Sequence, residues 1–172
     1  THSSHIVSDC DFDDLIYFKR ENGQIISKSF NSLRDEYADD MQGYKFVKQY
    51  LTLNRSELFF AEKAICIEGD TERILIPTMM QKVDEENPVE PSMMPLLSQN
   101  ISIIETGAHS QVFRKLFDFL GIKVLIITDI DPAKKNNESR FVSCDATEAT
   151  STTNASIKDF FEISGDDIFS II

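Results

Sequence analysis

The sequence predicts an α/β fold in which a parallel sheet is flanked by helices. Three short apolar runs are typical of strands, and segments with helical spacing lie between them. The runs are 63–67 (KAICI), 101–105 (ISIIE) and 123–131 (KVLIITDID). Strands that alternate with helices in this way usually form a parallel sheet, because each helix returns the chain across it.

The composition indicates a folded chain with a substantial core. The 172 residues are 41 % hydrophobic and include 13 Phe, which is unlike a disordered chain. No run of 18 apolar residues occurs, and the N-terminus has no signal-peptide pattern, so we expect a cytoplasmic protein that does not contact membranes. The first residue is not Met, which suggests a fragment of a longer protein.

Cysteine usage and charge exclude several classes of protein. The three cysteines are far apart and form no CxxC pair, so neither a zinc site nor a disulfide framework is expected. A net charge of −12 argues against a surface that grips nucleic acid with lysines and arginines throughout. It leaves room for an enzyme that reaches phosphates through metal ions, since a bound cation reverses the local sign of a carboxylate cluster.

The first third of the chain predicts a hairpin and a helix. Segments 14–19 and 25–30 are apolar enough for two strands, and ENGQ at 21–24 is typical of the turn between them. From 31 to 54 apolar residues recur at spacings of three and four, which predicts an amphipathic helix. Gly43 lies inside it and favours a break or bend there.

The run at 63–67 is apolar on both faces, as expected for the central strand of a parallel sheet. Asp70 or Thr71 can cap a following helix that extends to about Val83. Pro77 lies within that helix and is expected to kink or divide it. The expected inward-facing residues are Ile74, Leu75, Met79 and Val83.

The second half of the chain predicts two further helices separated by a polar stretch. HSQVFRKLFDFLG at 109–121 has its apolar residues on one side and is stopped by Gly121. Residues 132–156 are polar, and Asn154 or Ser156 can start a last helix through Phe161. The ATSTTNAS run at 149–156 favours a loop with an N-cap at its end; contact of its hydroxyls with a phosphate backbone is the alternative.

Four carboxylates are expected at one edge of the sheet. Glu68 follows one strand directly, and Glu72 lies one helical turn further on. Asp129 and Asp131 end another strand, where residues two apart point the same way. Sites in parallel α/β sheets form outside the carboxyl ends of the strands, so these side chains can converge.

A convergent set of carboxylates would repel itself unless it bound cations. Hard ions such as Mg²⁺ prefer oxygen ligands, and two of them can support both oxygens of a phosphodiester cleavage. Each residue alone has a simpler reading: Glu72 suits the dipole of a helix N-terminus, and the two aspartates suit a solvated turn. The combination, on adjacent elements in the right order, favours a metal site.

EGDTE at 68–72 followed by TDID at 128–131 resembles the Toprim fold, whose signature is a strand-end Glu-Gly and a DxD. The longer stretches RSELFFAEKAICIEGDTERILIP and ETGAHSQVFRKLFDFLGIKVLIITDID resemble the OLD (overcoming lysogenisation defect) family. In that family an ABC-type ATPase is followed by a Toprim nuclease. The resemblance covers residues 55–131 well and implies a Rossmann-like parallel sheet.

The resemblance implies roles for individual residues. Glu68, Glu72, Asp129 and Asp131 would hold one or two Mg²⁺ or Mn²⁺ ions, with Glu68 and Asp129 central to catalysis, and Gly69 would let the backbone turn tightly beside them. The family also uses a further acidic residue, for which Glu148 and Asp145 are candidates. Its lysine is assigned to Lys158, with a position after Ile172 as the alternative, and 134–135 could supply further positive charge. His109 is expected at the surface.

The resemblance also implies domains and partners. THSSH at 1–5 resembles the loop that closes an ABC ATPase, with His2 as the residue that senses ATP. Residues 1–30 would then end an ATPase whose remainder is absent, 31–54 would be a helical connector, and 55–172 a Toprim domain truncated at its end. No GxxxxGK[ST] motif occurs, so ATP would act only through the missing part. The implied partners are DNA, further copies joined through the ATPase, and a helicase or another defence protein.

Three functions are therefore compared. The leading one is a metal-dependent DNA endonuclease, in defence against phage. The second is another Toprim activity, either topoisomerase-like or primase-like, but none of the four tyrosines has a supporting motif and no nucleotide-handling module is visible. The third is a non-catalytic Toprim module used for assembly, which loss of a motif carboxylate would favour; all four are present.

Overall fold

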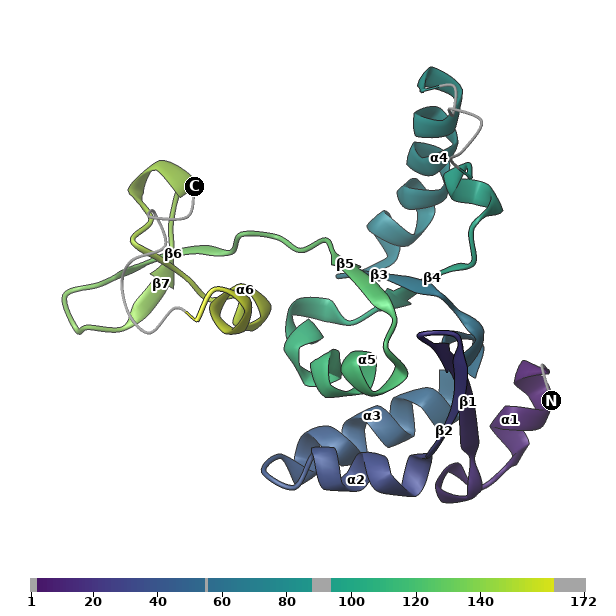
Figure 1. Ribbon diagram of the computed structural model, residues 1–172. Coiled ribbons are helices and arrows are strands. Elements are labelled where there is room, and N and C mark those ends of the chain that lie inside the picture. The colour runs from purple at the N-terminus through teal and green to yellow at the C-terminus, as the bar shows by residue number, and fades with distance from the viewer. Residues whose placement is uncertain (1–2, 55, 88–93, 163–172) are drawn as a thin grey trace.

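A parallel three-stranded sheet forms the centre of the computed structural model, which describes residues 3–54, 56–87 and 94–162 (Figure 1). Its strands are β3 (Lys63–Ile67), β4 (Ile101–Glu105) and β5 (Lys123–Ile126), in the order β4-β3-β5. Cys66 of β3 lies opposite Ile104 on one side and Ile126 on the other. The α/β class and the central position predicted for 63–67 are both confirmed.

Helices connect the parallel strands as expected. The chain passes from β3 to β4 through α4 (Asp70–Glu86) and the 3-10 helix η4 (Leu96–Ser98), and from β4 to β5 through η5 (Gly107–Phe113) and α5 (Arg114–Leu120). The segment predicted as one helix over 109–121 therefore begins with 3-10 geometry. Gly121 ends α5 in the left-handed region, with φ 63°, a conformation that costs glycine little.

The N-terminal segment contains the predicted hairpin. Helix α1 (Ser4–Asp9) and the 3-10 helix η1 (Phe12–Asp14) precede the antiparallel strands β1 (Ile16–Glu21) and β2 (Gln24–Ser29). Both turn residues have positive φ, 50° at Asn22 and 81° at Gly23. Such a two-residue turn matches the twist of a hairpin, which is why Asn-Gly is favoured there.

The helix expected over 31–54 is divided, but before Gly43. The 3-10 helix η2 (Phe30–Ser32) and α2 (Leu33–Glu36) are followed by α3 (Met41–Asn54) and the 3-10 helix η3 (Ser56–Phe60). The Gly43 amide donates to Asp40 Oδ1 at 2.9 Å, so Gly43 lies in the capped first turn of α3. A Cβ at this position would lie 2.1 Å from Asp40 Oδ2. The glycine makes room for the capping carboxylate.

One face of the sheet packs on the main hydrophobic core. Helices α3 and α5 lie on this side, with the β1–β2 hairpin beside them (Figure 1). Phe30 is only 2 % exposed, and its ring meets the rings of Phe12, Phe59 and Phe119 edge-on. The core extends from Phe12 to Leu120. It therefore joins the segments assigned from the sequence to three domains, and that assignment stays a prediction.

The other face of the sheet is covered by α4, and the predicted orientation of this helix is wrong. Ile76 is buried and packs with Ile65 and Ile67, with Met80 against them. The residues expected inward are exposed by 45 % or more: Ile74, Leu75, Met79 and Val83. Pro77 lies between Ile76 and Met80 in the sequence, and α4 continues through this proline. The helix does so although proline has no backbone N–H to donate. Within the described ranges, no helix is long and apolar enough to cross a membrane.

The polar stretch 132–156, in which a loop was expected at 149–156, contains a small antiparallel sheet. Its strands are β6 (Pro132–Lys135), β7 (Phe141–Ser143) and β8 (Ser151–Thr152), in the order β7-β6-β8, with the 3-10 helix η6 (Ala146–Glu148) between the last two. The predicted last helix is confirmed as α6 (Ala155–Phe160), capped by Asn154. Ser151, Thr152, Asn154 and Ser156 are buried, because this polar run pairs with β6 and continues into α6, which packs against η5.

Burial of Cys66 gives a direct test of the core. Desolvation raises the pKa of this thiol to about 12, so the reactive thiolate is scarce near neutral pH. We expect iodoacetamide at pH 8 to label the exposed Cys10 within minutes and to leave Cys66 unlabelled until the protein is unfolded. Peptide mass mapping of the labelled protein measures this. Equal labelling rates at the two cysteines would show that β3 is not buried in this way.

Candidate metal centre

Glu68 lies at the carboxyl end of the central strand, where the sequence placed it. It follows Ile67, the last residue of β3, and is half-buried. Neighbouring strands bring two more acidic residues to the same edge, since Glu105 ends β4 and Asp129 follows β5. The edge of the sheet thus carries an acidic residue from each strand, as the topology predicts.

One oxygen of Glu68 is held by three donors. Oε1 accepts from the Thr128 hydroxyl, from the Asp129 amide at 2.9 Å and from Asn154 Nδ2 at 3.1 Å. The donors come from the segment after β5 and from the residue that caps α6. Segments 60 to 86 residues apart in the chain therefore meet on one carboxylate oxygen.

Asn154 is the hub of this network. Its side chain is fully buried, and Nδ2 also lies 2.7 Å from Thr128 Oγ1 and 3.0 Å from the Asp129 carbonyl. Its Oδ1 accepts from the Ile157 amide at 3.1 Å and so caps α6. The sequence pattern gave only this capping role. The contacts with Glu68 depend on the fold of 132–153, for which the sequence indicated only a polar stretch with a loop at its end.

The two aspartates of the DxD motif have different surroundings. Strand β5 ends at Ile126, so the prediction that both lie in one strand and point the same way is wrong. Asp129 is exposed and its amide donates to Glu68. Asp131 is half-buried in the left-handed region, φ 47°, and its carbonyl accepts from the Thr153 amide at 3.0 Å. The structure therefore joins Asp129, through its backbone, to Glu68.

Glu72 and Gly69 form the start of α4. Glu72 Oε2 accepts from the Gly69 amide at 3.1 Å, the reciprocal half of a helix capping box. The cap is Gly69, and not Asp70 or Thr71 as expected. Gly69 is extended, with φ −163°, and a Cβ there would meet only Glu72 Oε2, at 3.9 Å. The tight glycine turn expected beside the metal is not present in this backbone.

An ion pair at the neighbouring strand end was not anticipated from the sequence. Arg73 Nη2 lies 3.3 Å from Glu105 Oε2, with both side chains partly exposed. Arg73 is one residue after Glu72, and Glu105 is the last residue of β4. Arg73 thus neutralises the charge of Glu105. In the described part of the chain, it does not pair with Glu68 or Asp129.

The other predicted site residues lie on the small antiparallel sheet and α6. Lys158 Nζ lies 5.4 Å from the centre of the Phe141 ring, and Lys135 Nζ lies 5.3 Å from it. Glu148 pairs with Lys134, and this hydrogen bond lowers the pKa of Glu148.

Two further candidates and one N-terminal residue complete the set. Asp145 Oδ1 accepts from the Thr147 amide and caps η6. His109 is exposed, as expected. His2 lies outside the described residues. The assignment of catalytic or ATP-sensing roles to these residues stays a prediction.

The carboxylates do not form a complete metal cage. Across 3–54, 56–87 and 94–162, no group of three or more His, Cys, Asp and Glu side chains is arranged to hold an ion. The chemistry of the donors nevertheless suits a hard cation. In the same ranges, no protein donor engages Oε2 of Glu68 or the carboxylate of Asp129. Mg²⁺ is commonly bound by one or two carboxylates, with water and substrate phosphate as the remaining ligands.

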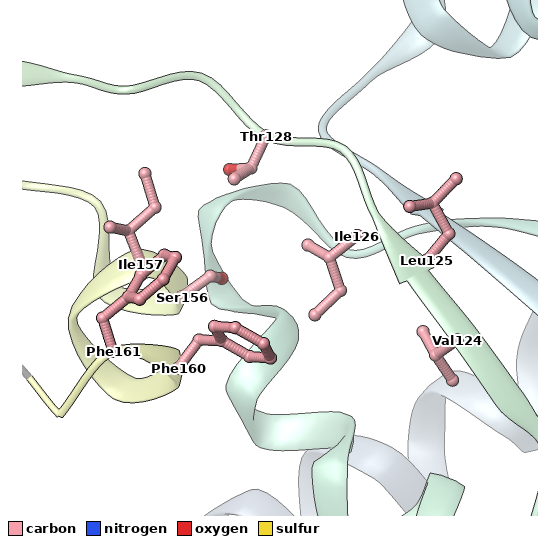
Figure 2. A pocket seen from close by; sticks show the side chains of 8 residues that line it. All are labelled: Val124, Leu125, Ile126, Thr128, Ser156, Ile157, Phe160 and Phe161. Carbon is pink, nitrogen blue, oxygen red and sulfur yellow. The ribbon is translucent and has the colours of Figure 1, made fainter. Parts of the chain in front are cut away.

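A pocket beside this network is apolar and unsuited to phosphate. It has a volume of about 300 Å³ and lies between β5 and α6 (Figure 2). Thr128 stands at one end of it, while Ile126 and Phe160 line the apolar part (Figure 2). Charged groups would lose their hydration there without gaining partners. The polar edge at Glu68 and Asp129, and not this pocket, is the candidate site.

The fold and this edge define an OLD-like Toprim segment. Residues 59–131 match the family described as "Overcoming lysogenization defect protein-like, TOPRIM domain". The match contains β3, α4, β4, α5 and β5, together with both motif segments that carried the resemblance. The resemblance to OLD-family Toprim domains is thereby confirmed for this part of the chain.

The chain is also similar to Endonuclease GajA from Bacillus cereus (strain HuB5-5). The two are 30 % identical over an alignment of 176 residues, gaps included, which covers 93 % of this chain and 24 % of the relative. The similarity therefore extends beyond the matched Toprim segment to both flanks. The chain spans about a quarter of the length of this relative.

Proposed function

We propose that this chain is the nuclease part of an OLD-type protein and that its carboxylate edge hydrolyses phosphodiester bonds of DNA with Mg²⁺ or Mn²⁺. The observation that carries the proposal is the pairing of Glu68 with the Asp129 segment at the carboxyl end of the central parallel strand. The relative named an endonuclease supports it. No other Toprim activity has a comparable supporting feature in this chain.

Glu68 and Asp129 would be the first metal ligands, with Glu72 and Asp131 completing the set. A bound divalent ion would supply Lewis-acid activation of a water and would neutralise charge on the scissile phosphate. The three donors bond Glu68 Oε1, and Oε2 would be the oxygen that binds the ion. Asp129 is exposed and accessible to an approaching strand.

The chain's own residues would bind and orient the substrate. The protein carries a net charge of −12, so DNA must approach this edge against overall repulsion. Lys158 and Lys135 have their Nζ atoms 5.4 and 5.3 Å from the centre of the partly exposed Phe141 ring, and together they combine positive charge with aromatic surface. Such combinations suit contact with a nucleic-acid strand. Arg73, paired with Glu105, is the cation that immediately borders the strand ends.

Plasmid cleavage tests the proposal. Supercoiled DNA is incubated with the longer ATPase–nuclease that we propose contains this chain, and with the 172-residue chain, in Mg²⁺, in Mn²⁺ and in EDTA. Relaxed or linear product that requires the divalent ion is the expected result for the longer protein. If the longer protein binds DNA but cleaves none in either metal, the assembly role replaces the nuclease role.

The wider context remains part of the proposal. A role in defence against phage, control by ATP through the segment around His2, and assembly into oligomers are all implied by the resemblance to the OLD family. Each of these properties concerns a longer protein. This chain corresponds to only 24 % of the length of the matched relative. Cleavage assays with and without ATP on the longer protein separate ATP control from the chemistry of the carboxylate edge.

A further inference from the structure

We infer that Asn154 is a positioning residue that presets Glu68 for metal binding. The inference rests on the proposed function, because it concerns the same carboxylate. Asn154 is fully buried at the junction of β8 and α6, and it reaches Glu68, Thr128 and Asp129 with one side-chain nitrogen. A residue far along the chain thus fixes both halves of the candidate metal centre.

The chemistry of an amide is required at this position. Nδ2 must donate, because Glu68 Oε1 and the Asp129 carbonyl can only accept. Oδ1 must accept, because it takes the Ile157 amide at the start of α6. Aspartate could accept but not donate, and serine could cap the helix but is too short to reach Glu68 as well. Asparagine alone among these capping residues satisfies both sides.

The support for Asn154 is itself ordered. The backbone N–H of Asn154 donates to Thr152 Oγ1 at 2.9 Å, and the Thr152 hydroxyl donates to the Ile130 carbonyl. Both Thr152 and Asn154 are fully buried. The Asp129 and Ile130 carbonyls are therefore tied to the same short segment, and the side-chain amide has little freedom to move.

The consequence for Glu68 is a fixed position of the Oε1 atom. With Oε1 occupied by three donors, rotation of the side chain would break all of them at once. Less of the ordering of the Glu68 side chain then remains to be done at the moment when Oε2 binds a metal. Partners of this kind commonly change metal affinity by about 10- to 100-fold when they are removed.

The test compares Mn²⁺ affinities of folded variants of the chain. Asn154→Ser retains a good helix cap but loses the donor to Glu68. Asn87→Ser is the matched control, since it removes an exposed side-chain amide that, among the described residues, bonds the Val83 carbonyl at the far end of α4. We expect Asn154→Ser to weaken Mn²⁺ binding by about 10- to 100-fold and Asn87→Ser to leave it unchanged, both measured by electron paramagnetic resonance.

A double variant identifies the route of the effect. In a Glu68→Gln background, where the ligand is already lost, Asn154→Ser is expected to lower Mn²⁺ affinity by a smaller factor than it does in the parent chain. NMR in the absence of metal can measure how fast the side-chain amide hydrogens of Asn154 exchange with solvent. This exchange is expected to be slow in the parent chain and faster in Glu68→Ala. A purely structural role for Asn154 would predict neither the coupling to Glu68 nor the change in exchange.

The possible outcomes separate this inference from the proposed function. Unchanged Mn²⁺ affinity in a folded Asn154→Ser chain overturns the positioning role and leaves the metal centre in place. A folded parent chain that binds no Mn²⁺ overturns both. If Asn154→Ser does not fold, Thr128→Val removes a different donor from Glu68 Oε1. Loss of Mn²⁺ affinity in that variant supports the preset carboxylate, and unchanged affinity contradicts it.

Discussion

Replacing Glu68 by Gln is expected to reduce metal-dependent cleavage of plasmid DNA by more than about 100-fold, because removing even a hydrogen-bond partner of a metal ligand commonly costs 10- to 100-fold. Gln is close in shape to Glu, and its carbonyl oxygen can accept the bonds now made to Oε1. The change therefore removes charge while keeping the network. Initial rates of relaxation of supercoiled DNA in Mn²⁺ measure the effect.

Two further variants interpret that result. Asp129→Asn keeps the backbone amide that donates to Glu68 and is expected to lose activity as Glu68→Gln does. Glu138→Gln removes one exposed acidic group, which pairs with Arg140 on the β6–β7 connection, and is expected to cleave normally. Undiminished cleavage by folded Glu68→Gln would remove Glu68 from the reaction. Equal loss in Glu138→Gln would indicate a general effect of charge instead.

Replacing Phe30 by Ala is expected to lower the free energy of unfolding by about 3–5 kcal/mol, the usual cost of deleting a buried aromatic ring. Phe30 is 2 % exposed, and the Phe12 and Phe59 rings lie 5.0 and 4.9 Å from it, centre to centre. A chain of this size should then melt about 6–20 °C lower. Thermal unfolding followed by circular dichroism measures the shift.

Phe160→Ala is the matched control for Phe30→Ala. The same ring is deleted, but from a side chain that is 66 % exposed. Surface changes of this type are usually within about 0.5 kcal/mol. Equal melting temperatures for Phe30→Ala and the parent chain would show that the hairpin does not share a core with the parallel sheet.

Much of the central fold could be predicted from local patterns. The strands at 63–67 and 101–105 are confirmed with their predicted bounds, because apolar runs of five residues between turn signals are typical of buried parallel strands. Gly121 ends α5 as expected. These features depend on neighbouring residues in the sequence, which is the information that a pattern contains.

The errors arise where tertiary contacts decide. On α4, both Ile74 and Ile76 are apolar, and only the packing against β3 determines that Ile76 is inside. The polar run at 149–156 is typical of a loop, but the hydroxyls of Thr152 and Ser156 and the side-chain amide of Asn154 find partners inside the protein. Pairing of β6 with β7 and β8 depends on segments that no local pattern connects.

The candidate site was predicted only in part for the same reason. The position of Glu68 follows from its place directly after β3. The position of Asp129 follows from the DxD motif after β5. Asn154 could be predicted as a cap, but its bond to Glu68 joins residues 86 positions apart. The geometry of Asp131 was missed because the strand ends five residues before it, at Ile126.

The most direct test of the metal centre is anomalous X-ray diffraction from crystals of this chain soaked in Mn²⁺. The account predicts an anomalous peak within bonding distance of Glu68 Oε2 and the Asp129 carboxylate, about 2.0–2.6 Å for hard divalent ions. The same peak should be missing in Glu68→Gln crystals. A peak held only by other carboxylates, with Glu68 and Asp129 free of metal, would contradict the account.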